Sequence, residues 1–292
     1  MEKRALGNTG LEVTLLGYGA IPIGDRELSE EAVERTINTV LDSGVNFVDT
    51  APDYWDSEER IGKYISHRRS EYYLATKCGC DITESGEPLG HIWTKEKLIS
   101  NLELSLRRMR TDYVDIWQIH NASVDDVDQG ELLAVMEEVK RSGKVRHISV
   151  SSHLPHVRTF IERGDFETYQ ITYSALDRAH EMVIGEASAS GCGVIVRGYV
   201  GSVGSKTRRP KRLELWKKAN LDELLGEGES RFQFLLRFTI SHKEISTTIV
   251  GTSNADHLAE NLASIEAGPL PNATYEEAKR RLDAAGESPK TA

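Results

Sequence analysis

The chain has 292 residues and a net charge of −10, with 36 lysines and arginines against 46 aspartates and glutamates. With 39% hydrophobic and 28% charged residues, its composition is that of an ordinary folded protein and not of a disordered one. The acidic balance argues against a general binder of phosphate backbones, so no nucleic-acid partner is expected. No apolar run approaches the roughly 20 residues that a membrane span needs, so no membrane partner is expected either.

The three cysteines, Cys78, Cys80 and Cys192, are odd in number and show no framework spacing. Together with an N-terminus that lacks a long apolar stretch, they favour a reducing, cytoplasmic compartment. Cys78-Gly79-Cys80 could form a metal or redox pair, but no second Cys/His pair at ligand spacing completes such a site. The sequence therefore predicts no metal site.

Short runs of β-forming residues alternate with longer helical patterns along the whole chain. Eight runs are predicted strands: Val13–Gly19, Asn46–Ala51, Tyr72–Cys78, Tyr113–His120, Val145–Ser152, Thr168–Tyr173, Gly193–Val200 and Ser246–Gly251. Several are almost continuously apolar, as strands buried on both faces must be. Eight such units of about 36 residues favour an α/β fold, the (β/α)8 TIM barrel. The alternative is a doubly wound open sheet, but Pro22 follows Gly17-Tyr18-Gly19 where a dinucleotide-binding fingerprint would begin its helix.

Capping residues mark the predicted helices. Ser29 and Thr94 each precede an amphipathic pattern, and Gly44 ends the first one. Asp128 followed by Glu131 resembles a capping box. No linker or repeat interrupts the chain, so residues 1–292 are expected to form a single domain, with the tail after Gly286 frayed. Two polar insertions, Gly79–Trp93 and Gly201–Pro210, are expected on the C-terminal face of the barrel, where binding loops collect.

Polar residues stand at the ends of three consecutive predicted strands. Asp49 ends the second and is followed by Tyr54, Lys77 ends the third, and His120 ends the fourth. Because the strands of a barrel end at one rim, these four side chains are expected to converge. A lone aspartate or lysine at a strand end is usually a cap or an ion-pair partner, so the prediction depends on all four together.

The four residue types can act jointly as a proton donor. A nearby ammonium stabilises a tyrosine phenolate and lowers its pKa, a carboxylate keeps that ammonium charged, and an imidazole can orient a carbonyl oxygen. Side chains themselves supply no hydride, so a nicotinamide is the expected partner in the reaction.

The sequence resembles the aldo-keto reductase family over nearly its whole length. Four segments carry the resemblance besides the opening Leu6–Gly19: Gly44–Tyr54, Ser57–Gly62, Asp112–His120 and Gly143–Ser151. The resemblance implies a barrel with an N-terminal β-hairpin that binds NADP(H) across its C-terminal rim. It also implies a catalytic tetrad of Asp49, Tyr54, Lys77 and His120, with Tyr54 as the general acid in reduction and the base in oxidation.

The resemblance also implies a set of cofactor-binding residues. These are Gly19, Ala20, Ile21, Asp49, Ser151, Ser152, Gln170, Arg197, Gly198, Tyr199, Gly251, Thr252, Ser253, His257, Glu260 and Asn261. Ser151 and Gln170 match contacts to the nicotinamide carboxamide, and Glu260 and Asn261 match contacts to the adenine. The start of the helix near Asn254 suits a phosphate.

This chain departs from the family at several of these positions. Ser152 stands where asparagine is usual, and Arg197 where many members stack an aromatic ring on the nicotinamide; Tyr199 is a second candidate for that contact. Gly251 and His257 replace the lysine and arginine that grip the 2′-phosphate in many members. NADPH is still expected rather than NADH, with Lys206, Arg208 and Arg209 as possible sources of charge.

A substrate pocket is expected around Tyr54, Trp55, Trp93 and His120. Aromatic lining favours a small carbonyl compound, or the corresponding alcohol, with an apolar or sugar-like face. The sequence gives no indication of the oligomeric state.

Two other functions fit the same residues. A lysine at a strand end of a barrel can form a Schiff base, which would make Lys77 an aldolase nucleophile, although Asp49 would favour the charged, unreactive form of that lysine. The second alternative is a non-catalytic barrel that senses a cofactor, because a fold alone does not determine a function.

Overall fold

The computed structural model describes residues 1–198 and 208–290, apart from the side chains of 208 and 209. Eight parallel strands close into a barrel: β3 (Leu16–Gly19), β4 (Phe47–Asp49), β5 (Tyr73–Cys78), β8 (Val114–His120), β9 (Val145–Ser151), β10 (Thr168–Thr172), β11 (Gly193–Arg197) and β12 (Thr247–Val250). The order around the barrel follows the chain, and β12 pairs with β3 to close it. This is the predicted TIM barrel.

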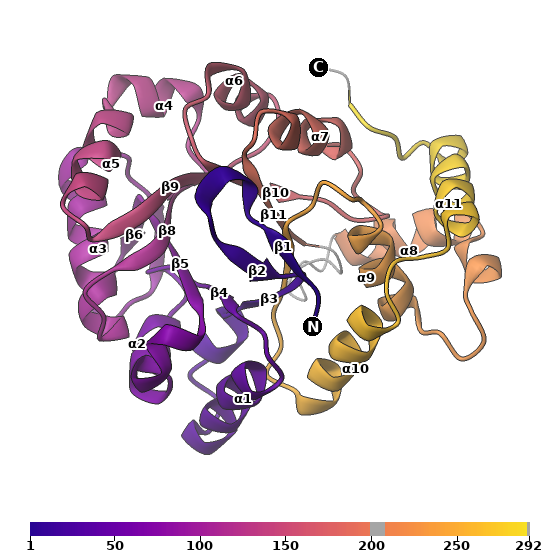
Figure 1. Ribbon diagram of the computed structural model, residues 1–292, viewed down its shortest axis with the longest axis horizontal. Coiled ribbons are helices and arrows are strands. Elements are labelled where there is room, and N and C mark those ends of the chain that lie inside the picture. Colours follow the sequence, from indigo (N-terminus) through magenta and orange to yellow (C-terminus); the bar gives the residue numbers. More distant parts are fainter. Residues whose placement is uncertain (199–207, 291–292) are drawn as a thin grey trace.

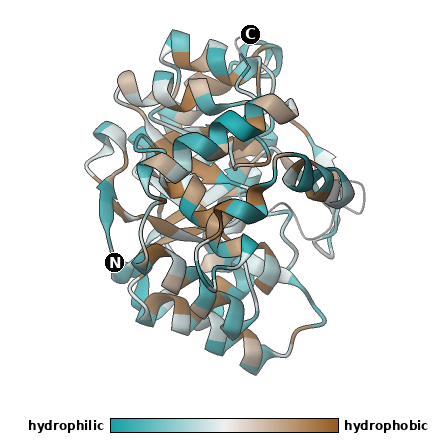
Figure 2. Ribbon diagram, turned by 90° about the vertical axis from the view of Figure 1, so that its right-hand side faces the viewer, coloured by the Kyte–Doolittle hydropathy of each residue, from teal (hydrophilic) through white to brown (hydrophobic). Residues whose placement is uncertain are grey.

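Helices surround the barrel (Figure 1). The α-helices of the described residues are α1 (Glu30–Asp42), α2 (Ser57–Tyr64), α3 (Lys95–Met109), α4 (Val124–Gln129), α5 (Leu132–Arg141), α6 (His156–Arg163), α7 (Glu181–Ala189), α8 (Arg208–Lys218), α9 (Arg231–Ile240), α10 (Ala255–Glu266) and α11 (Asn272–Ala285). Short 3-10 helices lie at Gly7–Thr9, η2 (Ile21–Gly24), Ser66–Glu71 and Leu221–Leu224. Hydrophobic residues gather toward the inside of this shell and hydrophilic ones toward its outer surface (Figure 2).

An N-terminal hairpin, β1 (Lys3–Ala5) with β2 (Glu12–Thr14), lies across one end of the barrel (Figure 1). Leu6, Leu11 and Val13 from this segment pack against Phe47 and Ile116 from the barrel interior. The hairpin thus fills the N-terminal mouth with apolar side chains and leaves the carboxyl ends of the strands for the polar residues. The prediction of a single strand over Val13–Gly19 was wrong. The structure divides this segment between β2 of the hairpin and β3 of the barrel.

Several predicted helix signals are confirmed, and one is wrong. Ser29 accepts a hydrogen bond from the Ala32 N–H, and Thr94 accepts one from the Lys97 N–H, as N-caps do. The predicted capping box at Asp128 does not form. Ser123 and Asp126 make the capping box of α4 instead, and the next helix starts after Glu131, whose φ is +48°.

The segments expected to be irregular are partly ordered. Gly79–Trp93 contains a second hairpin, β6 (Cys80–Ile82) with β7 (Pro88–His91). Most of Gly201–Pro210 lies outside the described residues, and α8 begins at Arg208. The tail up to residue 290 is not frayed, since Glu287 accepts a hydrogen bond from the Arg178 N–H and the Lys290 N–H donates to the Ala179 carbonyl. Among the described residues, each helix is too short or too polar to cross a membrane.

Candidate active site

A buried ion pair occupies the carboxyl end of the barrel. Lys77 Nζ lies 2.7 Å from Asp49 Oδ2, and both side chains are at most 2% exposed. The ammonium also donates to the Thr50 carbonyl at 2.9 Å. Asp49 and Lys77 come from adjacent strands, β4 and β5. Asp49 pairs with Ala75, and Lys77 stands two residues later on β5. Because every second residue of a strand faces the same side, both side chains point inward. Burial works to lower the pKa of Lys77, but Asp49 and Tyr54 outweigh it and raise the pKa above its usual range.

Two glutamines hold the other oxygen of the carboxylate. Gln118 Nε2 donates to Asp49 Oδ1 at 2.7 Å, and Gln170 Nε2 donates to the same atom at 2.9 Å. Asp49 therefore accepts from an ammonium and two amides in a site without bulk water, which is what a buried carboxylate requires. Gln170 is one of the expected cofactor residues, whereas Gln118 is not among the expected site residues. Its inward direction follows from its position two residues before His120 on β8.

Tyr54 lies on the loop that follows β4. Gly24 of η2 permits this placement, since a Cβ there would come within 2.1 Å of the Tyr54 carbonyl oxygen. The Tyr54 ring lies 4.8 Å from Lys77 Nζ, measured to its centroid, and it meets the His120 ring edge-on at 6.3 Å. The four predicted residues are thus brought together.

The pKa of Tyr54 differs in direction from what the sequence suggested. Burial raises the pKa of Tyr54 to about 12, and the nearby Lys77 lowers it by less than burial raises it. The cause is the cost of placing a phenolate in a low-dielectric site. Tyr54 therefore keeps its proton at neutral pH, which makes it a proton donor.

His120 lies at the end of β8 among other polar groups. Burial, followed by Lys77 and His91, lowers the pKa of His120 well below its usual range. The ring is therefore neutral near pH 7. Its Nδ1 lies 3.4 Å from Cys80 Sγ and 3.6 Å from Asp53 Oδ2.

Three expected cofactor residues lie on neighbouring strands. Ser151 Oγ donates to Gln170 Oε1 at 3.1 Å, and Ser152 Oγ donates to the Ala122 carbonyl at 3.4 Å. All three side chains are buried at the carboxyl ends of β9 and β10. Their hydroxyl and amide groups fit a carboxamide, which both donates and accepts hydrogen bonds.

Arg197 ends β11, and one of its terminal nitrogens lies 3.3 Å from His153 Nε2. Gly198 follows with φ of +82°. Tyr199, the second candidate for contact with a nicotinamide, lies outside the described residues, as does Lys206.

Two glycines and η2 meet where β12 ends. A Cβ on Gly251 would lie 2.7 Å from the Gly19 carbonyl oxygen and 2.9 Å from Pro22 Cδ, so this close approach excludes a lysine without a backbone shift. Ala20 is buried beside it and donates its N–H to the Asp49 carbonyl at 2.8 Å, while Ile21 is 46% exposed.

The turn between β12 and α10 carries the remaining expected contacts. Thr252 accepts a hydrogen bond from the Tyr18 hydroxyl through its carbonyl, and Ser253 is half-buried. The Asn254 side chain caps α10 and already takes the N–H groups of Asp256 and His257, so a phosphate would have to share this terminus with it. His257 is exposed.

Glu260 and Asn261 follow on α10, at the expected adenine end of the site. Glu260 accepts a hydrogen bond from the Ser230 hydroxyl, and Asn261 is 7% exposed. These two side chains are held in place by the protein and can offer an acceptor and an amide to a purine.

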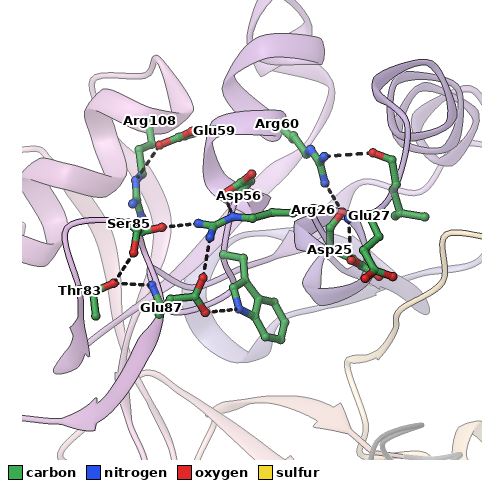
Figure 3. A network of polar contacts seen from close by, with 12 residues as sticks. Asp25, Arg26, Glu27, Asp56, Glu59, Arg60, Thr83, Ser85, Glu87 and Arg108 are labelled. Carbon is green, nitrogen blue, oxygen red and sulfur yellow. Dashed lines mark hydrogen bonds and ion pairs between the residues drawn. The ribbon is translucent and has the colours of Figure 1, made fainter.

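Both expected substrate-lining tryptophans make a hydrogen bond near the hairpin β6–β7. Trp55 is 36% exposed, and its Nε1 donates to Glu87 at 3.2 Å. Trp93 Nε1 donates to the His120 carbonyl at 3.1 Å. Arg26 ties this hairpin to the Tyr54 loop by contacting Glu87 at 2.6 Å and Asp56 at 2.8 Å (Figure 3).

The family model "Aldo/keto reductase family" matches residues 15–282. The chain belongs to the aldo/keto reductase family. It is 29% identical to an L-galactose dehydrogenase from Arabidopsis thaliana, over 91% of this chain and 88% of that protein. It is 30% identical to an NADH-specific methylglyoxal reductase from Escherichia coli, over 62% of this chain and 61% of that one. Among solved structures, an aldo-keto reductase from Bacillus halodurans in its holo form has a TM-score of 0.83 and 27% identity, covering 96% of each chain.

This aldo-keto reductase is therefore an oxidoreductase of a family that uses NAD(P)H. Sequence reasoning missed Asp53 and His91 and set Cys80 aside as a metal ligand; all three surround His120 in the structure. They come from a loop and both strands of a hairpin, and that hairpin was expected to be an irregular loop. Recognising Cys80 and His91 as flanks of one turn would have placed them together.

Proposed function

We propose that this chain reduces small aldehydes or ketones with NADPH, and oxidises the corresponding alcohols in the reverse direction, as one barrel domain in a cytoplasmic compartment. The observation that carries the proposal is the buried Asp49–Lys77 pair beside a protonated Tyr54, with a neutral His120 edge-on to it. Three free cysteines support a reducing compartment.

Each residue of the site has a distinct part in this reaction. Tyr54 gives its hydroxyl proton to the carbonyl oxygen as that oxygen gains negative charge, and the phenolate takes the proton back in alcohol oxidation. Lys77 stabilises the phenolate, and Asp49 keeps the lysine charged and in place. His120, being neutral, can donate one hydrogen bond to the carbonyl oxygen and orient it. A bound nicotinamide would supply or accept the hydride.

The donor set at the rim supports a nicotinamide dinucleotide. Ser151, Ser152 and Gln170 would hold the carboxamide, and Glu260 with Asn261 would hold the adenine. The same residues support NADPH over NADH less strongly. Gly251 leaves no room for the lysine that many members have there, and one relative is an NADH-specific enzyme. The expectation of NADPH rests on the basic residues Lys206, Arg208 and Arg209.

A fluorescence titration of the purified protein with NADPH, and separately with NADH, tests the cofactor without any guess about the substrate. We expect tighter binding of NADPH. Tighter binding of NADH would correct the cofactor and keep the reductase, and binding of neither to folded protein would contradict the proposal.

The relatives suggest a substrate panel of small, oxygen-rich carbonyl compounds. One relative is named for L-galactose and another for methylglyoxal, which are a sugar and a small ketoaldehyde. We propose that the substrate is of this class, since Trp93 contacts the His120 carbonyl and Trp55 follows Tyr54 on its loop, which supplies aromatic side chains near the polar groups of the site. Methylglyoxal, L-galactose and simple aliphatic aldehydes are the three arms of the test.

The pH dependence of the reaction follows from the pKa shifts. Reduction needs protonated Tyr54, whose pKa is raised to about 12, so kcat/KM for reduction should stay flat between about pH 7 and pH 10. Oxidation needs the phenolate, so its kcat/KM should rise up to tenfold per pH unit over that range. Because the pKa of His120 is well below its usual range, neither profile should show a step near pH 6.5. A reduction rate that falls between pH 7 and pH 9 would contradict this assignment.

The aldolase alternative is opposed by the lysine's environment. A Schiff base needs a neutral lysine, and Asp49 at 2.7 Å helps to raise the pKa of Lys77 above its usual range. Borohydride trapping with a carbonyl compound should therefore leave Lys77 unmodified.

A further inference from the structure

Four potential metal ligands of different chemistry meet beside His120. Asp53, Cys80, His91 and His120 each offer one ligand atom, and these atoms all lie within 4.8 Å of one another. We propose that this cluster is a binding site for one zinc ion. The site departs from the sequence-based expectation of no metal, and the binding itself does not depend on the proposed reductase function.

The distances suit tetrahedral zinc. Zinc–nitrogen, –oxygen and –sulfur bonds of about 2.0–2.3 Å place neighbouring ligand atoms roughly 3.3–3.8 Å apart in a tetrahedron. His120 Nδ1 lies 3.4 Å from Cys80 Sγ and 3.6 Å from Asp53 Oδ2, which are two such edges. With the whole set within 4.8 Å, the remaining ligand atoms need shifts of about an ångström to complete the tetrahedron.

Two of the four residues of the cluster have a buried polar atom without a hydrogen-bond partner among the described residues. Within the described chain, Asp53 Oδ1 and His91 Nε2 are buried and have no hydrogen-bond partner. Leaving such atoms unpaired costs free energy, and a metal ion would satisfy them. The donor set also selects the ion, because thiolate and imidazole ligands suit zinc, whereas magnesium and calcium prefer oxygen alone.

The fold holds the ligands in place. Cys80 and His91 are directly opposed across the β6–β7 hairpin, so their side chains start from neighbouring positions. Trp93 stacks on the His91 ring, with centroids 5.7 Å apart and planes 4° from parallel, and donates to the His120 carbonyl. The contacts of Arg26 with Ser85 and Glu87 fix the turn of the same hairpin (Figure 3). Such surroundings orient metal ligands.

Binding changes the state of two ligands. The Cys80 thiol loses its proton to solvent as the sulfur–zinc bond forms. Coordination through Nδ1 of His120 leaves the ring proton on Nε2, which fixes the tautomer that can donate to a carbonyl oxygen. This last consequence rests on the proposed function, whereas the site does not.

Equilibrium dialysis of the full-length, chelator-treated protein against zinc chloride tests the proposal without cofactor or substrate. We expect one zinc per chain. Loss of a residue that only supports a metal ligand typically weakens binding about 10–100-fold. Cys80→Ser and His91→Gln remove ligands themselves, so each should weaken zinc binding by at least this factor. Cys192→Ser removes a free thiol elsewhere and is the matched control, with unchanged binding expected. His91 is half-buried, so His91→Gln keeps the test valid if Cys80→Ser does not fold.

Cobalt in place of zinc reports the sulfur ligand directly. We expect the thiolate-to-cobalt charge-transfer absorption in the wild type and in Cys192→Ser, and its loss in Cys80→Ser. No stoichiometric zinc binding, or equal binding by the wild type, Cys80→Ser and His91→Gln, would overturn the proposal. A failed NADPH titration with zinc binding intact would instead contradict only the reductase.

Discussion

Tyr54→Phe is expected to lower kcat for carbonyl reduction by about 10²–10⁴-fold, the usual contribution of a positioned proton donor. The substitution removes one hydroxyl and keeps the ring that Lys77 and His120 contact. Affinity for NADPH should therefore change little, and steady-state kinetics with a fluorescence titration of each variant measures both quantities.

The control for this variant is Tyr113→Phe, which removes a hydroxyl at a half-buried ring that Arg69 covers. It should retain wild-type kcat. Turnover of Tyr54→Phe within a few-fold of wild type would refute the assigned role of Tyr54. A parallel loss of NADPH affinity would indicate that the loop after β4 had moved.

Asp49→Ala is expected to destabilise the fold by about 3–5 kcal/mol at pH 7, because it leaves the Lys77 ammonium buried without its counter-charge. Urea unfolding should show this as a lower midpoint with an unchanged slope. Two amide donors, Gln118 and Gln170, lose their acceptor in the same variant and add to the cost.

A double variant separates the charge from the packing. Asp49→Ala combined with Lys77→Met removes both charges and should be more stable than Asp49→Ala alone, since replacing a whole buried pair costs less than breaking it. Glu277→Gln disrupts an exposed ion-pair cluster with Arg280 and Arg281, and it should leave the unfolding midpoint nearly unchanged. If Asp49→Ala is no less stable than Glu277→Gln, the buried pair does not have the energetic role given to it here.

The barrel and the convergence of the four candidate residues could be predicted because each follows from local rules. Near-continuous apolar strands alternating with capped helices predict a parallel sheet, and strand ends of a barrel share one rim, so Asp49, Lys77 and His120 had to be neighbours. Tyr54 could be added to them because it closely follows Asp49, on the loop that leaves the same rim.

What could not be predicted depends on contacts between distant segments. The proposed zinc-ligand set joins Asp53, a hairpin and the end of β8, and sequence spacing could have indicated only the pairing across the hairpin. The pKa of Tyr54 is raised by burial, which no sequence pattern measures. Likewise, the close approach of the Gly19 backbone to Gly251, which leaves no room for a lysine there, is a contact between distant segments.

Isotope transfer tests directly whether this chain moves a hydride from NADPH to a carbonyl carbon. NADPH that carries deuterium at nicotinamide C4 is incubated with the wild-type protein and each carbonyl compound of the panel, and the alcohol product is examined by mass spectrometry. We expect deuterium on the former carbonyl carbon for at least one small aldehyde or ketone, at a rate that falls in Tyr54→Phe. Two results would contradict the proposed reductase. One is NADPH that binds without transferring deuterium to any of these compounds, and the other is a carbonyl adduct on Lys77 that borohydride traps.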